Sequence, residues 1–374
     1  MTERSGAIGF SEEQAELLES ASKYCADKSP VDAVRRLIGG ELGHDPAVTG
    51  EIAELGWFGI AIPEAYGGAG LELAEVVPAV EQMGRRLMAG PFVSTTLAAQ
   101  ILLSAGTEVQ KSEVLPQLAA GAAATLAIAE PHADFDMRHV ECSGERIGDQ
   151  VVLSGTKCLV LDAHLAKWAI ASVMLDGEVS LVLLDAAAIA GCERHREIVI
   201  DETRRSFRFV LDGLRVAASA ILDPSLVGGA LARLELAGAL LTAAEMCGGG
   251  ASCIDYTVSY LNSRKQFGRP IGAYQALKHA AVHAHLGIEQ ARSLLYGAAH
   301  TFENAEEGEV AVRMAKASAG PALAFAADRA IQFHGGYGFT YECDAQLYRR
   351  RAFWGESQYG DAIYHRRKLA DAIL

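Results

Sequence analysis

The stretch "RKQFGRPIGAYQALKH", residues 264–279, places three cations within six residues and then continues with apolar residues at helical spacing. This is unusual, because the whole chain carries a formal net charge of -14. Arg264 ends a helical pattern that begins near Ser252, and an arginine at such a place ordinarily interacts with the helix dipole. That role does not account for Phe267 and Gly268 just after it. A guanidinium group beside an aromatic ring instead suits a ligand that carries both phosphate and a flat ring.

Length and composition restrict the kind of protein. The chain has 374 residues, and single cores stop growing at roughly 250–300 residues, so two or three domains are expected. The acidic balance argues against nucleic acid or an anionic membrane as a partner. Seven cysteines without CxxC spacing, in a chain without a signal-like first segment, predict reduced thiols and a cytoplasmic protein.

Two further features of the sequence bear on whether the chain spans a membrane or binds a metal. The most apolar segment, residues 236–254, is interrupted by Glu245 and by three glycines, so no membrane span is expected. His279 and His283 are four residues apart in a helical pattern, but no third ligand lies at a telling spacing. No metal site is therefore expected.

The hydrophobic pattern divides the chain into three regions and predicts an α+β fold that is mainly helical. Residues 1–122 have apolar spacing near that of a helix, and the first helix is expected to begin at a capping box of Ser11 and Gln14. Residues 123–224 contain short β-prone runs and predict a small antiparallel β-domain. Residues 225–374 return to long amphipathic helices and predict a bundle of the four-helix type. The turn signals inside the β-domain are Gly148-Asp149, Asp176-Gly177 and Asp212-Gly213.

Two glycine clusters in the last region each have two explanations. Residues 248–250 are three consecutive glycines, which mark either a break between two helices or the close approach of another backbone or a ligand. Gly335, Gly336 and Gly338 either end a helix or let backbone amides approach an anion. The pattern of residue types does not decide between these explanations.

The opening stretch, taken with "QFHGGYGFT" at 332–340 and "LYRRRA" at 347–352, resembles the acyl-CoA dehydrogenase family. The segments "IPEAYGGAG" at 62–70 and "SGTK" at 154–157 occur where that family has them. The resemblance covers essentially the whole chain and implies the family's order of a helical domain, a β-domain and a helical bundle. It also implies FAD as cofactor, an acyl-CoA substrate that is oxidised between its α and β carbons, a tetramer, and a flavoprotein as electron acceptor.

The resemblance assigns the opening stretch to cofactor binding across a subunit interface. By analogy, Arg264, Phe267 and Gln275 would contact the pyrophosphate and adenine half of a FAD held mainly by a neighbouring chain. In the same way Gln332, Gly335 and Gly336 would face that FAD. Each charge-assisted contact to phosphate would contribute about 1.5–3 kcal/mol.

The motifs that would hold a FAD of this chain's own depart from the family pattern. The family's TEPxAGSD reads "AEPHADFD" at 129–136, so that Ala129 replaces threonine, His132 and Asp134 replace small residues and Phe135 replaces serine. The family's Trp-Ile-Thr reads Leu-Val-Leu at 159–161. Both the aromatic wall and the hydroxyl groups are missing.

The catalytic base is also missing from the family's two positions. Tyr359 replaces the glutamate of the C-terminal position, and counting back from the opening stretch without gaps places Gly238 at the other. A tyrosine with a pKa near 10 is a poor base at neutral pH. Glu235 and Glu245 remain as weak catalytic candidates, with Glu356 weaker still. Glu235 is otherwise a surface carboxylate beside an arginine, and Glu245 otherwise caps a helix break.

Together these departures predict a subunit that completes the FAD site of a partner chain. Some bacterial members of the family that act on steroid side chains are mixed tetramers of this kind, and this chain resembles their subunit without a base. One alternative is an active homotetramer that uses Glu235 or Glu245 as its base. Another is a binding or scaffold protein that has lost flavin chemistry.

Overall fold

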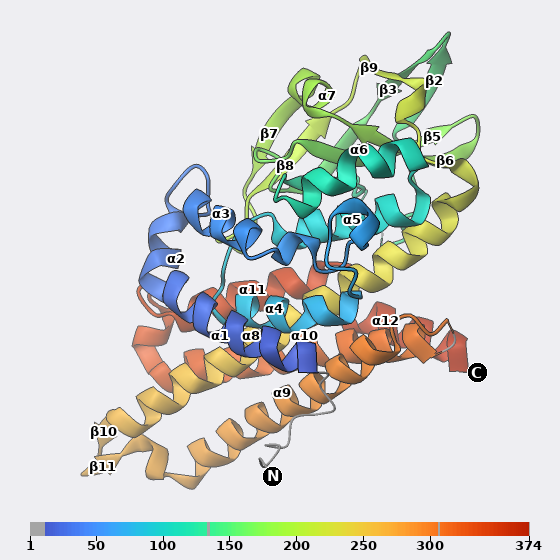
Figure 1. Cartoon of the computed structure of the whole chain (residues 1–374). Coiled ribbons are helices and arrows are strands. Elements are labelled where there is room, and N and C mark those ends of the chain that lie inside the picture. The colour runs from blue at the N-terminus through green and yellow to red at the C-terminus, as the bar shows by residue number, and fades with distance from the viewer. Residues whose placement is uncertain (1–11, 133–134, 306, 374) are drawn as a thin grey trace. The chain divides into compact units, whose positions relative to one another are not determined.

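The computed structural model describes residues 12–132, 135–305 and 307–373 (Figure 1). The chain divides into two compact units. The first contains the described residues up to Arg36, the segment Leu73–Met88 and the chain from Gly238 onward; the second contains Leu37–Glu72 and Ala89–Ala237. Ser11 lies outside the described residues, so the capping box at the first helix stays a prediction.

The first unit is helical. In it α10 packs along α9, and both α11 and α12 pack on α10. A short hairpin, β10 (Lys265–Gln266) and β11 (Arg269–Pro270), separates α8 from α9. The helices are α1 (Glu12–Lys28), α2 (Val31–Ile38), α4 (Leu73–Arg85), α8 (Val227–Ser263, from Gly238 on), α9 (Gln275–Thr301), α10 (Glu307–His334), α11 (Ala345–Ser357) and α12 (Ala362–Ile373).

The three glycines at 248–250 lie inside α8, which continues through them without a break. A methyl group on Gly248 would overlap the carbonyl oxygen of Glu81 on α4, and one on Gly250 would overlap Ile288 on α9. On the facing helix, a methyl group on Gly84 would overlap the backbone of Glu245. Close backbone approach is therefore the correct explanation for these glycines, and a helix break is wrong. For the same reason Glu245 caps no break, and the helix before Arg264 does not begin near Ser252.

The second unit combines three longer helices and one short helix with two sheets. The longer helices are α3 (Pro46–Glu54), α5 (Phe92–Ala105) and α6 (Glu108–Ala119). The larger sheet has six strands: β1 (Ala124–Ala127), β2 (Ser143–Ile147), β3 (Gln150–Ser154), β5 (Trp168–Leu175), β6 (Glu178–Leu184) and β9 (Leu214–Ala217). The smaller has three: β4 (Thr156–Leu161), β7 (Glu193–Glu197) and β8 (Ser206–Val210). The short helix α7 (Ala186–Gly191) follows β6.

The β-domain confirms the predicted hairpin turn at Asp176-Gly177, where φ is 55° and 85° and the chain passes from β5 to β6. The prediction of a purely antiparallel domain is wrong in one respect, because β5 pairs in parallel with both β1 and β2. The connection of 40 residues between β1 and β5, residues 128–167, is long enough for the chain to return in the same direction.

The apolar segment from Pro224 to Ser263 is long and apolar enough to cross a membrane by length and composition. Of its most apolar window, however, 61% is buried inside the fold. Core helices that never enter a membrane pass the same test. All seven cysteines are free.

Candidate functional site

The stretch that begins at Arg264 forms a tight hairpin directly after α8. The Arg264 amide donates a hydrogen bond to the Tyr260 carbonyl (2.9 Å), and its carbonyl accepts one from the Ile271 amide (2.8 Å). Phe267 and Gly268 occupy the turn with φ of 53° and 82°. Left-handed backbone at a bulky residue is uncommon, costs energy and persists only where the surroundings enforce it. Here two β-bridges, Lys265 to Pro270 and Gln266 to Arg269, enforce it.

The side chains predicted to bind the cofactor from this hairpin are exposed to solvent. Phe267 is 92% exposed, and Arg264 and Gln275 are exposed as well. Arg269 stacks on the ring of Tyr274 at 4.2 Å, next to the first residue of α9. The fold does not use Phe267 or Arg264 for its core, so both remain available to a ligand or a partner.

The second predicted set lies where α10 ends. The His334 ring stacks on Tyr256 and Tyr260 of α8, with centroid distances of 4.8 and 4.1 Å. Tyr260 is one turn before Arg264, so this stack brings the end of α10 to the same end of α8 as the hairpin. The structure therefore gathers both predicted sets at one end of the first unit. This stack was not predicted from the sequence. The one signal in the sequence is the spacing of Tyr256 and Tyr260 by four residues, which places both rings on one face of a helix.

The glycines after α10 face open space. Gln332, Gly335 and Gly336 are all exposed, and no atom lies within 4 Å of a methyl group built on either glycine. Gly335 has φ of 62°. Gly338 is different, because a methyl group there would overlap the Ile331 carbonyl, so that glycine serves the turn itself. An exposed arginine, an exposed aromatic ring and bare backbone at one end of a helical unit fit the phosphates and adenine of FAD.

The two residues that the resemblance assigns to the positions of a base, Tyr359 and Gly238, are in contact in the structure. The ring of Tyr359 lies against Gly238, and a side chain at position 238 would overlap that ring. Tyr359 has φ of 52°, and its carbonyl accepts a hydrogen bond from His365 Nε2 (2.8 Å). Burial of the phenol, and next the charge of Glu245, raise the pKa of Tyr359 above its ordinary value. The phenol therefore remains protonated at neutral pH.

The candidate glutamates lie in different surroundings. Glu245 is buried and pairs with the fully buried Arg351, at 3.7 Å between Oε1 and Nη1. Glu235 is half-buried on the part of α8 that belongs to the second unit. Its neighbour Arg233 donates to Gln100 Oε1, at 3.1 Å from Nη2.

Glu356 is the third candidate and lies beside Lys316. A methyl group built on Gly320 of α10 would come within 3.1 Å of the Glu356 carboxylate. The Glu356 charge favours the charged form of Lys316, but burial outweighs it and lowers the pKa of Lys316 to about 8. The negative charge of Glu356 thus partly offsets the cost of burying the charged Lys316.

In the second unit, the family's flavin motif is built around a buried ion pair. Glu130 accepts hydrogen bonds from Lys157 Nζ (2.5 Å) and from the Glu141 amide (2.8 Å). Burial alone would raise the pKa of Glu130, but Lys157 and the backbone amides outweigh it and hold the pKa below its ordinary value. Ala129 offers no hydroxyl here, and Asp134 lies outside the described residues.

In the segment that replaces Trp-Ile-Thr, residues 159–161, a side chain of the same domain already occupies one backbone amide. Leu159 has φ of 53° and is partly exposed, and its amide donates to Glu197 Oε2 (2.9 Å). Val160 is fully buried. None of the three residues offers a hydroxyl to a flavin ring, so the residues present do not fit the flavin half of a FAD in the way the family motif does.

One group of three possible metal ligands occurs among the described residues: Glu130, His132 and Glu141. Their ligand atoms lie within 4.8 Å of one another. Both oxygens of Glu130 are already taken by Lys157 and backbone amides, and the ammonium group repels a second cation. His279 and His283 are exposed on α9 and do not belong to this group.

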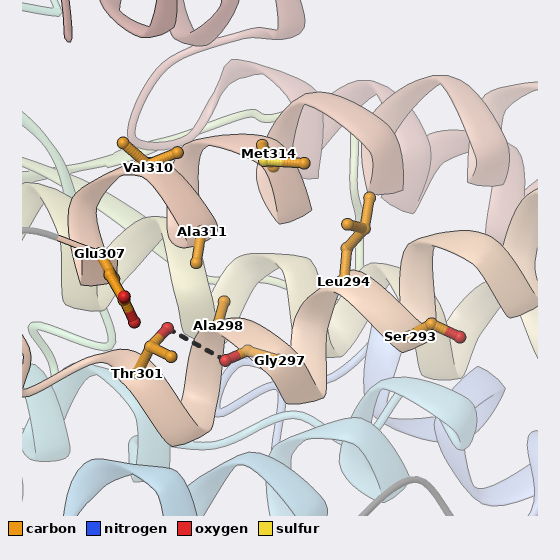
Figure 2. Close-up of a pocket in the computed structure, with 9 residues that line it drawn as sticks. All are labelled: Ser293, Leu294, Gly297, Ala298, Thr301, Glu307, Val310, Ala311 and Met314. Atoms are coloured by element: carbon orange, nitrogen blue, oxygen red, sulfur yellow. Dashed lines mark hydrogen bonds between the residues drawn. The ribbon is translucent and has the colours of Figure 1, made fainter. Parts of the chain in front are cut away.

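A cavity of about 420 Å³ lies between α9 and α10 (Figure 2). Small and apolar side chains line most of it, and Thr301 there donates to the Gly297 carbonyl (3.0 Å). It contains none of the predicted site residues.

Comparison with known proteins agrees with this architecture, which is that of flavin-dependent oxidoreductases. Residues 11–122 match the acyl-CoA dehydrogenase N-terminal domain, and residues 231–374 match its C-terminal domain. Acyl-CoA dehydrogenase IpdE2 of Mycolicibacterium smegmatis is 31% identical over 98% of this chain and 100% of its own length. IpdE2 of Mycobacterium tuberculosis is 32% identical over 91% of each chain. The chain belongs to the acyl-CoA dehydrogenase family, FAD-dependent oxidoreductases that act on CH–CH bonds.

Solved structures show the same fold. A structure titled as a Tcur3481-Tcur3483 steroid ACAD variant has a TM-score of 0.86 and 28% identity, over 97% of this chain and 98% of that one. The ChsE4-ChsE5 complex of Mycobacterium tuberculosis has a TM-score of 0.89 at 20% identity, over 98% of each chain. The predicted order of helical domain, β-domain and helical domain is confirmed.

Proposed function

We propose that this chain is one subunit of a hetero-oligomeric acyl-CoA dehydrogenase, in which it completes the FAD site of a homologous partner and does not itself remove the α-proton. The observation that carries the proposal is the contact between Tyr359 and Gly238. Both residues stand where the family places a base, and neither has a carboxylate. The Tyr359 ring also fills the space that a side chain at position 238 would need.

The exposed end of the first unit supports the cofactor role. Arg264 would pair with the pyrophosphate, Phe267 would lie against the adenine, and Gln275 would donate to the same half of the cofactor. Gln332 and the bare backbone at Gly335 and Gly336 would face it from the end of α10. FAD, when bound, supplies the acceptor for the hydride that leaves the β carbon of the thioester. This chain contributes the binding and orientation of the cofactor.

The residues that would contact the flavin ring in this chain's own site also support the proposal. Ala129 and residues 159–161 lack the hydroxyl groups of the family motif, and Glu197 engages the Leu159 amide. A chain built in this way binds FAD through a partner that supplies the missing half.

The comparisons favour a particular substrate class. A solved structure of similar fold, 28% identical to this chain, is titled as a Tcur3481-Tcur3483 steroid ACAD variant. We therefore propose an acyl-CoA thioester with a steroid-derived acyl group, oxidised in the cytoplasm with a flavoprotein as electron acceptor. Seven free cysteines agree with a reducing compartment.

A second candidate is an active homotetramer that uses Glu245 as base. The observation in its favour is that Glu245 acts on the pKa of Tyr359 and so lies near the family's base positions. Against it, the Glu245 carboxylate is buried and paired with Arg351.

The proposal is tested by the flavin content of the chain purified alone. We expect a nearly colourless protein whose visible spectrum shows FAD far below one per chain, and full flavin content once the homologous partner is co-expressed. A homo-oligomer that is yellow, with one FAD per chain, would contradict the split site and favour the second candidate.

A further inference from the structure

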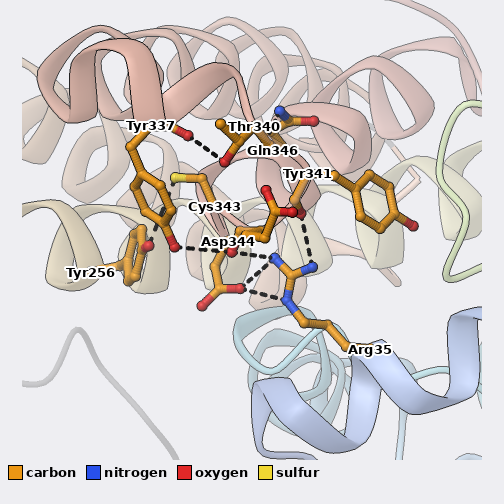
Figure 3. A network of polar contacts seen from close by, with 9 residues as sticks. Arg35, Tyr256, Tyr337, Thr340, Tyr341, Cys343, Asp344 and Gln346 are labelled. Atoms are coloured by element: carbon orange, nitrogen blue, oxygen red, sulfur yellow. Dashed lines mark hydrogen bonds and ion pairs between the residues drawn. The ribbon is translucent and has the colours of Figure 1, made fainter.

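Arg35 of α2 binds a segment more than 300 residues further along the chain, within the same unit (Figure 3). Its Nε and Nη2 donate to Asp344 Oδ1 at 2.8 and 2.7 Å. Its Nη1 donates to the Tyr341 carbonyl (2.9 Å), and its Nη2 also donates to the Glu342 carbonyl (3.0 Å). One guanidinium group thus bonds three residues of the 341–344 segment: Tyr341, Glu342 and Asp344.

This segment is the second half of the connection between α10 and α11, which we call the cofactor loop and define as residues 335–344. The loop begins with the 3₁₀ turn Gly335–Phe339 and then runs without regular secondary structure to α11. Its ties within itself and to α11 are local: Tyr337 OH donates to the Glu342 carbonyl (3.1 Å), and Gln346 Nε2 donates to the Thr340 carbonyl (2.6 Å). Local bonds fix the shape of a loop but not its place on the fold, which depends on contacts with other helices. Cys343 provides one such contact, because it is fully buried and its Sγ lies 3.7 Å from the hydroxyl of Tyr256 on α8. The bonds from Arg35 of α2 provide another such contact for the second half of the loop.

The bonds from Arg35 are well suited to fix that place. The Arg35 side chain is 22% exposed and that of Asp344 is 20% exposed, so water screens the pair less than a surface ion pair. A planar guanidinium with five donors can hold a carboxylate and two carbonyls together, whereas an ammonium group presents one point charge. The Tyr341 ring lies near both Arg35 and Arg350, with its centroid 5.9 and 5.5 Å from their guanidinium carbons.

We propose that Arg35 is a positioning residue for FAD: by holding Tyr341, Glu342 and Asp344, it fixes the cofactor loop so that Gly335 and Gly336 stand ready to receive the cofactor. This inference rests on the proposed function, because it takes those glycines as cofactor contacts. Arg35 itself acts through the loop and has no contact with the cofactor in this scheme. Without it the loop must be ordered at the moment of binding, and that ordering weakens affinity.

The test compares four variants of the assembled oligomer as it is isolated: Arg35→Ala, Arg35→Lys, Asp344→Asn and the control Arg36→Ala, an exposed arginine next to Arg35 on α2. FAD is removed and titrated back while flavin fluorescence is followed. We expect Arg35→Ala to raise the Kd for FAD about tenfold, which is about 1.4 kcal/mol. Arg35→Lys and Asp344→Asn should give smaller increases, and Arg36→Ala should give none.

Amide hydrogen exchange separates positioning from general stability. In the FAD-free protein, exchange at residues 335–344 should rise in Arg35→Ala by much more than exchange in α9 does, whatever the change in unfolding temperature. Unchanged FAD affinity in Arg35→Ala would overturn the inference, as would a general loss of protection with no local change. If Arg35→Ala does not assemble, Asp344→Asn gives the same decision, because it removes the carboxylate and leaves the shape.

An Arg264→Ala variant distinguishes failure of this inference from failure of the proposed function. If Arg264→Ala weakens FAD binding and Arg35→Ala does not, the cofactor site stands and the role of Arg35 is wrong. If neither variant changes FAD binding, the cofactor site itself is wrong.

Discussion

At the scale of single residues, the exposed side chains of the hairpin are those whose removal says most about ligand binding. Arg264 contributes to the fold through its backbone, which bonds Tyr260 and Ile271. Its side chain is exposed, and surface substitutions of this kind usually change stability by less than about 0.5 kcal/mol. An effect of Arg264→Ala on cofactor content would therefore report on binding and not on folding.

We expect Arg264→Ala to lower FAD retention by the assembled oligomer, with a loss of about 1.5–3 kcal/mol in cofactor affinity from the missing contact to phosphate. Lys265→Ala is the matched control, since Lys265 is a neighbouring exposed cation in the same hairpin. Flavin content after gel filtration and thermal unfolding are measured for both. Equal flavin content in Arg264→Ala and the parent would rule out the cofactor role.

His365 gives a prediction for pH. Its Nε2 bonds the Tyr359 carbonyl, so Nε2 carries the proton and Nδ1 faces Arg313 Nη1 at 3.4 Å. Burial first, and then the charges of Lys316 and Arg313, lower the pKa of His365 from 6.5 to about 4. As the pH falls from 6.5 toward 4, the unfolded chain takes up a proton before the folded chain does. His365 therefore contributes to a loss of stability across that window.

In His365→Gln the amide can still donate to the Tyr359 carbonyl but cannot titrate. We expect the difference in unfolding free energy between about pH 7 and about pH 5 to be smaller in this variant than in the parent, by about 1–2 kcal/mol. Urea unfolding at the two pH values measures it. Parallel pH profiles for parent and variant would show that His365 does not titrate differently on folding.

At the scale of elements, the crossing of α4 and α8 depends on two glycines. Gly84 and Gly248 let the backbones meet, and neither can accept a methyl group without moving the facing helix. The sequence pattern predicts both helices but not their contact, because three glycines in a row suit a break as well as a crossing. Prediction from the sequence pattern fails for one strand as well. Strand β7 reads "ERHRE" and has no alternation of apolar and polar residues, so the pattern does not indicate a strand there.

Gly248→Ala and Gly229→Ala make a matched pair within α8. Alanine at position 229 meets no atom within 4 Å, so it should add about 0.5–1 kcal/mol of stability through helix propensity. Alanine at position 248 would overlap the Glu81 carbonyl, and the strain should cost about 1–3 kcal/mol or more. Denaturant unfolding of both variants is the measurement. Stabilisation by both would mean that the helices have room to move apart.

At the scale of the whole molecule, the sequence can propose cofactor-binding residues because each proposed set is local. Arg264, Phe267 and Gln275 lie within one hairpin and the first turn of a helix, so a short motif contains their geometry. The contact of Tyr359 with Gly238 joins two distant segments, as does the clamp of Arg35 on Asp344. No local pattern determines such pairs, because they depend on how the helices pack.

The variants Glu235→Gln and Glu245→Gln test the proposal that this chain does not supply the catalytic base. Each substitution keeps the size of the side chain and its hydrogen bonding but removes the charge, so it tests proton removal separately from packing. General base catalysis contributes about 10²–10⁴-fold to rate, so loss of a true base would be plain in turnover. With the partner subunit present we expect both variants to oxidise acyl-CoA at nearly the parental rate, and Glu245→Gln to lose some stability because Arg351 is then buried beside a neutral side chain. A collapse of turnover in one variant, with FAD bound and the fold intact, would identify that glutamate as the base and make the homotetramer the better assignment.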